Sequence, residues 1–215
     1  MKFVLGTKQN MTTVFSEDGR SRAATIIRVA PTFVTQIKTK ATDGYDAVQI
    51  GGIAIHEKHA NKAQLGHIAK AVKTGNPEAA VPALKHFREE RLSKAADVVL
   101  GSALDLSLFA IGDTVEVAAL TKAKGFQGGV KRHGFHGGPR SHGQKHSERE
   151  PGSIGGGGGR AGGRVAKGMR MAGRMGGERV TVKGLTVLQS LPETGELVLS
   201  GAVPGRRGTI VEIRG

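Results

Sequence analysis

Residues 122–177 constrain this chain more than any other stretch, because they combine many glycines with many cations. This basic stretch holds 56 residues, of which 19 are Gly, 12 are Lys or Arg and two are acidic, so it carries +10 of the chain's net charge of +14. Its large apolar side chains are few and scattered, whereas ordering each residue costs about 1–2 kcal/mol of backbone entropy. The basic stretch is therefore predicted to be disordered alone and to gain structure on a polyanion, whose counterions its cations displace.

A plain linker is the alternative interpretation of this stretch. Flexible linkers, however, are rich in Gly with Ser or Pro rather than in Gly with Arg, Lys and His. Nucleic acid is therefore the predicted partner, contacted through cations on its phosphates and through histidine rings that hydrogen-bond or stack on RNA.

Composition disfavours several other classes of protein. There is no Cys, which excludes disulfides, thiolate metal sites and a cysteine nucleophile. No apolar run approaches the roughly 20 residues of a membrane span, and the apolar run at residues 3–5 is shorter than the core of a signal peptide. Seven Phe, one Tyr and no Trp are too few for a platform that stacks successive bases, which favours contacts to the nucleic-acid backbone.

Outside the basic stretch, the pattern indicates short antiparallel strands separated by turn residues. Residues 2–15 are predicted to form two short strands around a turn at residues 6–10. The other strands are predicted at residues 24–30, 32–38, 45–50, 97–100, 103–109, 114–120, 179–189, 196–203 and 209–213.

A different periodicity interrupts these strands. Leu65, Ile68 and Val72 recur at helical spacing after Asn61, which is a candidate N-cap, so a helix is predicted there. We interpret residues 55–95, approximately, as a small helical insertion. The predicted fold class is mainly β: an antiparallel β-barrel with a small α-helical insertion and a long irregular basic extension.

The predicted barrel uses sequence from both sides of the basic stretch. Its body comprises residues 1–121 and 178–215, and the basic extension comprises residues 122–177. Because strands precede and follow the extension, both of its ends are expected to be tethered to a rigid body.

The glycine run at residues 155–163 contains spacings that resemble a dinucleotide-binding fingerprint. Such a site needs a strand before the run, a helix after it and an acidic residue about 20 positions on. Here Pro151-Gly152-Ser153-Ile154 precedes the run, and Arg, Gly and Lys follow it. The match is therefore attributed to chance.

Histidines provide the other chemical candidates. His133 with His136, and His142 with His146, have spacings that suit a metal, but the surrounding cations disfavour a metal ion. The His56-Glu57-Lys58-His59 sequence lacks the spacing of a zinc-protease helix and is predicted to lie on the surface. No catalytic arrangement stands out, so an enzyme is not expected.

Short blocks along nearly the whole chain resemble bacterial-type ribosomal protein L three of the large subunit. The opening GTKQNMT at residues 6–12 is similar to that family's G-x-K-x-G-M-T, and residues 43–49 are similar to its D-G-Y-x-A-x-Q block. Further matching blocks follow in the family's order: KGFQG at 124–128, SHG at 141–143, PGSIG at 151–155, MAGRMG at 171–176 and GAVPG at 201–205.

The resemblance implies a translation-factor-like barrel on the ribosome surface and an extension that threads into large-subunit rRNA towards the peptidyl transferase centre. It also implies direct rRNA binding, a role in early assembly near the rRNA 3′ end, neighbouring large-subunit proteins as partners, and a location in the ribosomes of a bacterial-type cytoplasm. No membrane, small-molecule substrate or cofactor is expected, apart from structural Mg²⁺ associated with the rRNA. The candidate rRNA-binding residues are Lys8, Lys122, Lys124, Lys131, Arg132, His133, His136, Arg140, His142, Lys145, His146, Arg149, Arg160, Arg164, Lys167, Arg170, Arg174 and Arg179.

Several positions depart from the family's pattern. Asn10 replaces a usual Gly, and its tolerance of positive φ would preserve a turn. Gly156 stands where some members carry a methylated Gln, so no modification is expected there. Residues 156–163 are richer in Gly than usual, and Ala166 replaces a common aromatic. Two alternatives remain: a stand-alone nucleic-acid chaperone built on the same barrel, and a nucleotide- or metal-dependent enzyme.

Overall fold

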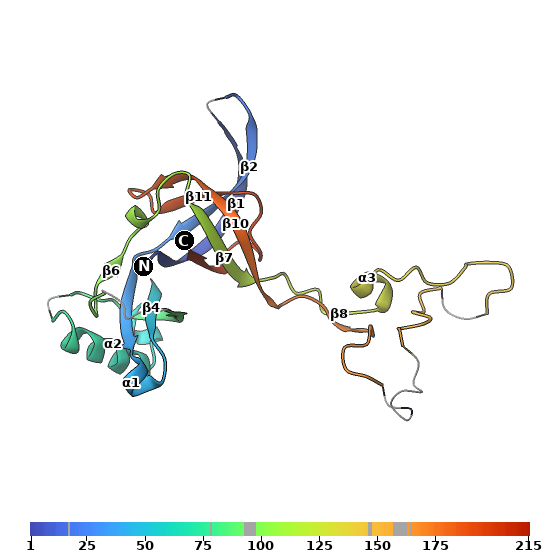
Figure 1. The fold of residues 1–215 in the computed structure, drawn as a ribbon, viewed down its shortest axis with the longest axis horizontal. Helices are drawn as coiled ribbons and strands as arrows, with labels where there is room; N and C mark the ends of the chain where they lie inside the picture. Colours follow the sequence, from blue (N-terminus) through green and yellow to red (C-terminus); the bar gives the residue numbers. More distant parts are fainter. Residues whose placement is uncertain (17, 78, 93–97, 146–147, 157–162, 164) are drawn as a thin grey trace. The chain divides into compact units, whose positions relative to one another are not determined.

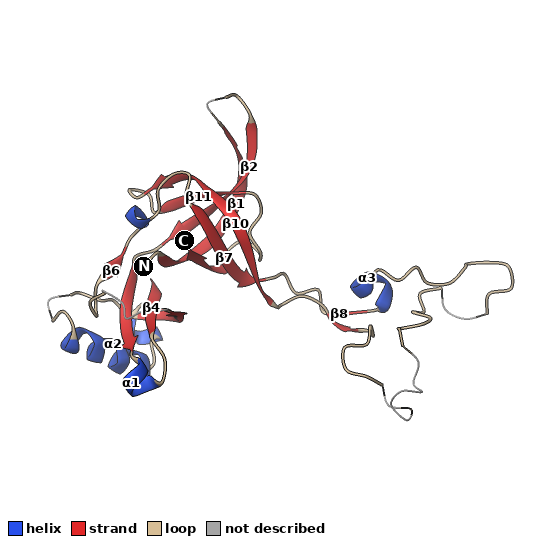
Figure 2. Ribbon diagram, viewed as in Figure 1, coloured by secondary structure: helices blue, strands red, loops and turns tan. Residues whose placement is uncertain are grey.

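The computed structural model describes the whole chain except residues 17, 78, 93–97, 146, 147, 157–162 and 164. Contacts divide the chain into two compact units. We call Met1–Leu120 together with Arg179–Gly215 the body unit, and Thr121–Glu178 the basic unit. The mainly β fold class is confirmed, since strands dominate the body unit (Figure 2).

A closed antiparallel barrel forms the larger part of the body unit. Its core contains apolar side chains from all its strands, including Val4, Ile27, Val117, Leu199 and Ile213. In order around the barrel, the strands are β1 (Phe3–Phe15), β12 (Ile210–Arg214), β7 (Thr114–Leu120), β10 (Arg179–Leu191), β11 (Glu196–Ser200) and β2 (Ser21–Val29).

The first strand, β1, differs from its prediction. Two short strands around a turn were expected, whereas the structure has one strand of 13 residues with a register shift between Lys8 and Met11. Gly6 serves close approach and not a turn, because a Cβ there would lie 2.6 Å from Cγ2 of Ile27. Asn10 lies within this strand and is not among the described residues with positive φ, so the expected turn conformation is also wrong.

A second sheet packs beside the barrel within the body unit. Phe3 and Leu5 of β1 contact Val34, Val48 and Ile50 in a second apolar cluster, while Val4 between them faces the barrel core. Both faces of β1 are therefore buried here, which explains its uninterrupted apolar run. The four strands of this sheet, in order, are β5 (Leu84–Arg91), β4 (Ala47–Ala54), β3 (Thr32–Lys38) and β6 (Ala103–Leu104).

This second sheet corrects the prediction of a single barrel with a helical insertion. The strands expected at residues 32–38 and 45–50 belong to the second sheet, not to the barrel. The supposed insertion also contains the strand β5, which pairs with β4 from Ala47↔Arg91 to Ala54↔Leu84. Sequence reasoning missed β5 because its run LKHFREER is rich in residues with good helix propensity, which tertiary pairing overrides.

Helices cover part of the body unit. α2 (Lys62–Thr74) has Asn61 as its N-cap, as predicted, and a capping box links Asn61 with Gln64. His67 of α2 lies 2.7 Å through Nε2 from Oε1 of Gln49 on β4. The short elements are α1 (Lys40–Asp43), η1 (Glu57–His59) and η2 (Leu106–Leu108).

Residues 98–109 depart from the predicted strands. Val98, Val99 and Leu100 are not in a strand, and Asp97, which belonged to the same prediction, lies outside the described residues. Of residues 103–109, only Ala103 and Leu104 pair with β3, and a 3₁₀ turn follows them. That turn places Leu106 and Phe109 in the barrel core, so burial of these two side chains outweighs continued strand pairing.

Candidate nucleic-acid interface

The basic unit has an outgoing limb, where the chain enters it, and a returning limb, where the chain leaves it. Backbone hydrogen bonds join the two limbs at this end. Thr121 N–H donates to the carbonyl of Glu178 and Lys124 N–H to that of Met175, both at 2.9 Å. Next along the limbs, β8 (Phe126–Gln127) pairs with β9 (Gly173–Arg174) in a two-stranded sheet (Figure 1). In the body unit, Leu120 and Arg179 are register partners on neighbouring strands, so the limbs start from adjacent points.

A short helix, α3 (Gly129–His133), fastens the outgoing limb to the returning limb. The helix ends at Gly134, which has a φ of 75° as a left-handed cap requires. Arg132 Nη1 donates to the carbonyl of Met171 at 2.7 Å, and His133 Nε2 lies 3.0 Å from the same oxygen. Two of the predicted rRNA-binding side chains therefore hold the basic unit together.

Glycine permits two further close approaches within the basic unit. A Cβ at Gly137 would lie 2.2 Å from the carbonyl oxygen of Glu148, and a Cβ at Gly176 would lie 2.2 Å from that of Lys122. Both glycines have positive φ, 78° and 70°. The glycines of this stretch thus allow the chain to approach itself, in addition to the approach to a partner that composition suggested.

Almost none of the described residues of the basic unit are buried. Gly129 is the only described residue between Thr121 and Glu178 that is classed as buried, against Phe135 and Pro151. The exposed cations that the structure describes here are Lys122, Lys124, Lys131, Arg140, Lys145, Arg149, Lys167, Arg170 and Arg174. The described residues of this unit thus form no apolar core and present a dense set of cations to solvent.

Acidic side chains offset little of this charge. Arg140 Nε lies 2.9 Å from Glu148 Oε2, but the two side chains are 85% and 48% exposed. Exposed ion pairs contribute only about 0–1 kcal/mol, so a phosphate can replace this carboxylate at small cost.

One hollow in the basic unit has walls of mixed chemistry. It has a volume of about 510 Å³ and is lined by Phe135, Ile154, Met169 and Arg170, with small neighbours. An aromatic ring, apolar walls and a guanidinium are the groups on which proteins stack an unpaired RNA base.

Comparison with known proteins identifies the family. Residues 88–190 match the family model described as Ribosomal protein L3. The large ribosomal subunit protein uL3 of Synechococcus sp. (strain JA-2-3B'a(2-13)) is 45% identical over 98% of this chain and 94% of its own length. The large ribosomal subunit protein uL3 of Acidothermus cellulolyticus is 44% identical over 100% of this chain and 92% of its own length. The large ribosomal subunit protein uL3c of Guillardia theta is 42% identical over 98% of this chain and 98% of its own length.

The chain belongs to the ribosomal protein uL3 family. The resemblance seen in the sequence blocks is thereby confirmed over nearly the full length of these relatives. Members of this family are structural ribosomal proteins and not enzymes, as predicted. Among the described residues, no helix is both long enough and apolar enough to span a membrane.

Two of the candidate rRNA-binding residues lie in the body unit, and each has hydrogen-bond partners within the chain. Lys8 Nζ donates to the carbonyls of Val203 at 2.5 Å and Gly205 at 3.1 Å. Arg179 donates through Nη2 to Glu212, and this hydrogen bond raises the pKa of the guanidinium. Intrachain pairing of this kind leaves no signature in composition, so the sequence could not reveal it.

The histidines that the sequence singled out lie in both units. His136 and His142 are exposed in the basic unit, and His142 has a positive φ of 59°. His56 and His59 are exposed in the body unit, as predicted. No group of three or more His, Cys, Asp or Glu side chains suited to a metal occurs among the residues that the structure describes. His146, Arg160 and Arg164 lie outside those residues.

Sequence reasoning passed over one residue of the basic unit. Phe126 is 76% exposed on β8, between Lys124 and the cations of α3. An aromatic side chain so exposed among cations suits stacking on a base. Its position in a Lys-Gly-Phe-Gln run was the only sequence signal.

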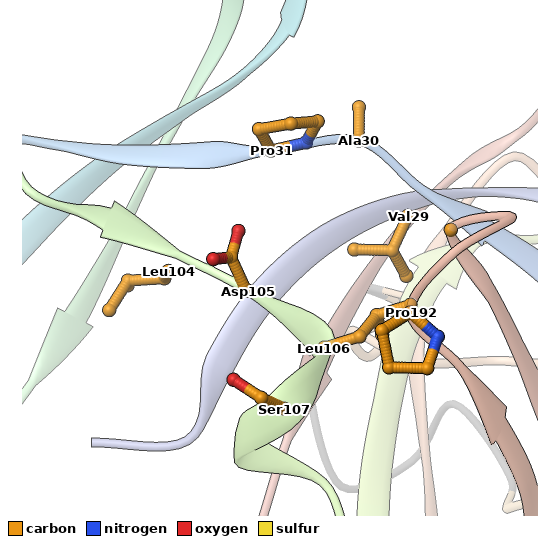
Figure 3. A pocket seen from close by; sticks show the side chains of 9 residues that line it. Val29, Ala30, Pro31, Leu104, Asp105, Leu106, Ser107 and Pro192 are labelled. Carbon is orange, nitrogen blue, oxygen red and sulfur yellow. The ribbon is translucent and has the colours of Figure 1, made fainter.

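A cavity of about 350 Å³ lies in the body unit where β2 passes into β3 (Figure 3). Pro31, Leu104, Leu106 and Pro192 give it mainly apolar walls, and Asp105 supplies the one carboxylate that lines it. Asp105 and Ser107 supply the polar side chains of this lining. We assign no ligand to this cavity.

Proposed function

We propose that this chain is a structural constituent of the large ribosomal subunit that binds large-subunit rRNA directly through its basic unit. One observation carries the proposal: the basic unit has no apolar core among its described residues, yet it exposes nine Lys and Arg side chains there. A segment that cannot stabilise itself by burial needs a partner, and these cations suit phosphates.

The two units would have separate tasks. The barrel is a rigid platform, and its register pair Leu120↔Arg179 holds both ends of the basic unit. The limb contacts of Arg132 and His133 preorganise the base of that unit, which reduces the entropy lost on binding. Exposed cations beyond this base then neutralise phosphates, while Phe126 and the hollow beside Phe135 accept unstacked bases.

Finer parts of the proposal rest on the family resemblance. They are early assembly near the rRNA 3′ end, an extension directed towards the peptidyl transferase centre, and contacts with neighbouring ribosomal proteins. Structural Mg²⁺ would be bound by oxygen atoms of the folded rRNA, because carboxylate ligands are scarce in the basic unit.

Salt dependence provides the test. Binding of an rRNA fragment should weaken steeply with salt, because each phosphate contact contributes about −0.7 to −0.9 to the slope of log affinity against log salt. Lys131→Gln, Lys167→Gln and Arg170→Gln should each make the slope shallower by about one unit. Lys183→Gln is the matched control, since Lys183 is also exposed but pairs with Glu116 in the body unit at 3.0 Å.

A flat salt response, or equal effects of the control and the three test variants, would contradict the proposed interface. Cosedimentation separates the ribosomal role from that of a stand-alone chaperone. A structural constituent remains in stoichiometric amount in large subunits washed at high salt, whereas a chaperone is removed.

A further inference from the structure

Strands β1 and β2 continue past the end of the barrel as a two-stranded hairpin (Figure 1). β1 pairs with β12 only from Phe3 to Thr7, but its pairing with β2 extends to Phe15↔Ser21. Among the described residues, the distal hairpin therefore has no third strand beside β1.

One face of this hairpin continues the interior face of the barrel. Side chains alternate along a strand, so Val29, Ile27 and Thr25 share a face with Ala23 and Ser21. The first three of these residues are buried and the last two are exposed. The register shift in β1 brings Met11 opposite Thr25, and therefore Met11, Thr13 and Phe15 lie on the same face.

This hairpin face, consisting of Met11, Thr13, Phe15, Ser21 and Ala23, is exposed and has no charged member. Phe15 is 72% exposed and Met11 is 48% exposed. The cations that adjoin this face in the sequence are not members of it: Arg22 pairs with Val14 on the opposite face, and Arg20 follows the turn. A neutral apolar face is notable in a chain with a net charge of +14.

We propose that the hairpin face docks on an apolar, uncharged patch of a neighbouring protein in the large ribosomal subunit. The location in the large subunit rests on the proposed function, whereas the docking surface and the chemistry of its partner are inferred from the hairpin itself. Enrichment in Phe and Met together with depletion of charge marks the centre of protein–protein interfaces. Phosphates require cations, which this face lacks, and a second copy of the chain would be repelled by its own +14.

Photocrosslinking within large subunits tests the partner class. A benzophenone amino acid replaces Phe15 in the full chain, and purified subunits are irradiated and then treated with ribonuclease. One discrete adduct with a single subunit protein, resistant to ribonuclease and identified by mass spectrometry, is expected. The same amino acid in place of Phe126 should give a ribonuclease-sensitive adduct, because that side chain lies in the basic unit.

The controls keep this inference separate from the proposed function. Absence of the chain from washed large subunits would overturn the proposed function. Incorporation with an RNA adduct at position 15, or with no adduct there, would overturn the hairpin inference alone.

A second experiment uses substitutions. Phe15→Ser should lower the amount of the crosslinked neighbour retained in salt-washed subunits by about tenfold, as expected for an interface hot spot. Ile111→Ser is the matched control, because Ile111 is similarly exposed in the body unit at 71% but lies outside the hairpin face. Phe15 is too exposed to support the core, so the thermal transition of the variant should match that of the parent. Unchanged retention in Phe15→Ser would overturn the inference.

Discussion

Glu212 is the residue on which several charges of the body unit converge. It is 6% exposed on β12 and accepts from Arg88 Nε at 2.8 Å and from Arg179. The partners belong to β5 and to the first position of β10, so one carboxylate joins both sheets to the strand that leaves the basic unit. A buried carboxylate requires such partners, because its desolvation is otherwise costly.

His86 on β5 allows a pH prediction at a single residue. Burial, followed by the charges of Lys85 and Arg88, lowers the pKa of its imidazole below the ordinary 6.5. As pH falls past about 6.5, the unfolded chain binds the proton first, so this contribution to stability is lost as pH falls through the folded pKa. The free energy of unfolding, measured with urea, should fall from about pH 7.5 to 5.5 more in the parent than in His86→Gln.

Equal pH dependence in the parent and His86→Gln would contradict this assignment. Carboxylates also titrate near the acidic end of this range, but they are common to both proteins. The difference between the two curves therefore isolates the imidazole.

At the level of elements, strand pairing determined the secondary structure where composition left it ambiguous. β5 contains Lys, Arg and Glu at five of its eight positions, and it forms a strand because its backbone pairs with β4. Lys38 of β3 and Glu89 of β5 lie 2.6 Å apart across this sheet, and the pairing raises the pKa of the lysine and lowers that of the glutamate. The charged residues of β5 thus tie the sheet together.

The pairing between the two limbs of the basic unit can be tested by substitution of a glycine. Gly176→Ala places a Cβ 2.2 Å from the carbonyl oxygen of Lys122 at a φ of 70°, and should open the pairing beside β8 and β9. Backbone strain of this kind costs about 1–3 kcal/mol, so affinity for an rRNA fragment should fall about tenfold.

Gly143→Ala is the control for this substitution. Gly143 also has a positive φ, 83°, but a Cβ there would meet nothing within 4 Å, and Gly143 does not line the hollow beside Phe135. If both substitutions lower affinity equally, the close approach at Gly176 has no role in forming the interface.

At the level of the whole molecule, the body unit should fold without the basic unit. Leu120 and Arg179 are register partners in an antiparallel pair, so an Asn-Gly turn can replace residues 121–178. The thermal transition of this deletion should stay within about 5 °C of the parent value, because every residue of both apolar clusters is retained. Binding to the rRNA fragment should be lost.

Calorimetry and a binding titration on the same preparation check this prediction. Loss of the cooperative transition would show that the basic unit contributes to the core of the body unit. Retained affinity for rRNA would place the main interface elsewhere.

Local chemistry explains why so much could be predicted from the sequence. A cation-rich glycine stretch cannot form an apolar core, whatever surrounds it, and alternation in residues such as Val115, Val117 and Ala119 marks a strand without knowledge of its neighbours. The mainly β class, the strand at Thr114–Leu120 and the helix after Asn61 follow from such short-range patterns.

Long-range pairing accounts for the rest. Whether a strand joins the barrel or the second sheet depends on partners far along the chain, as β5 and β3 show. Arg179 and Lys8 look like phosphate ligands by residue type, yet Glu212 and two loop carbonyls lie within their reach only after the barrel has closed. The neutral hairpin face likewise exists because a register shift and the end of the barrel leave Met11 and Phe15 uncovered, and neither is encoded in local composition.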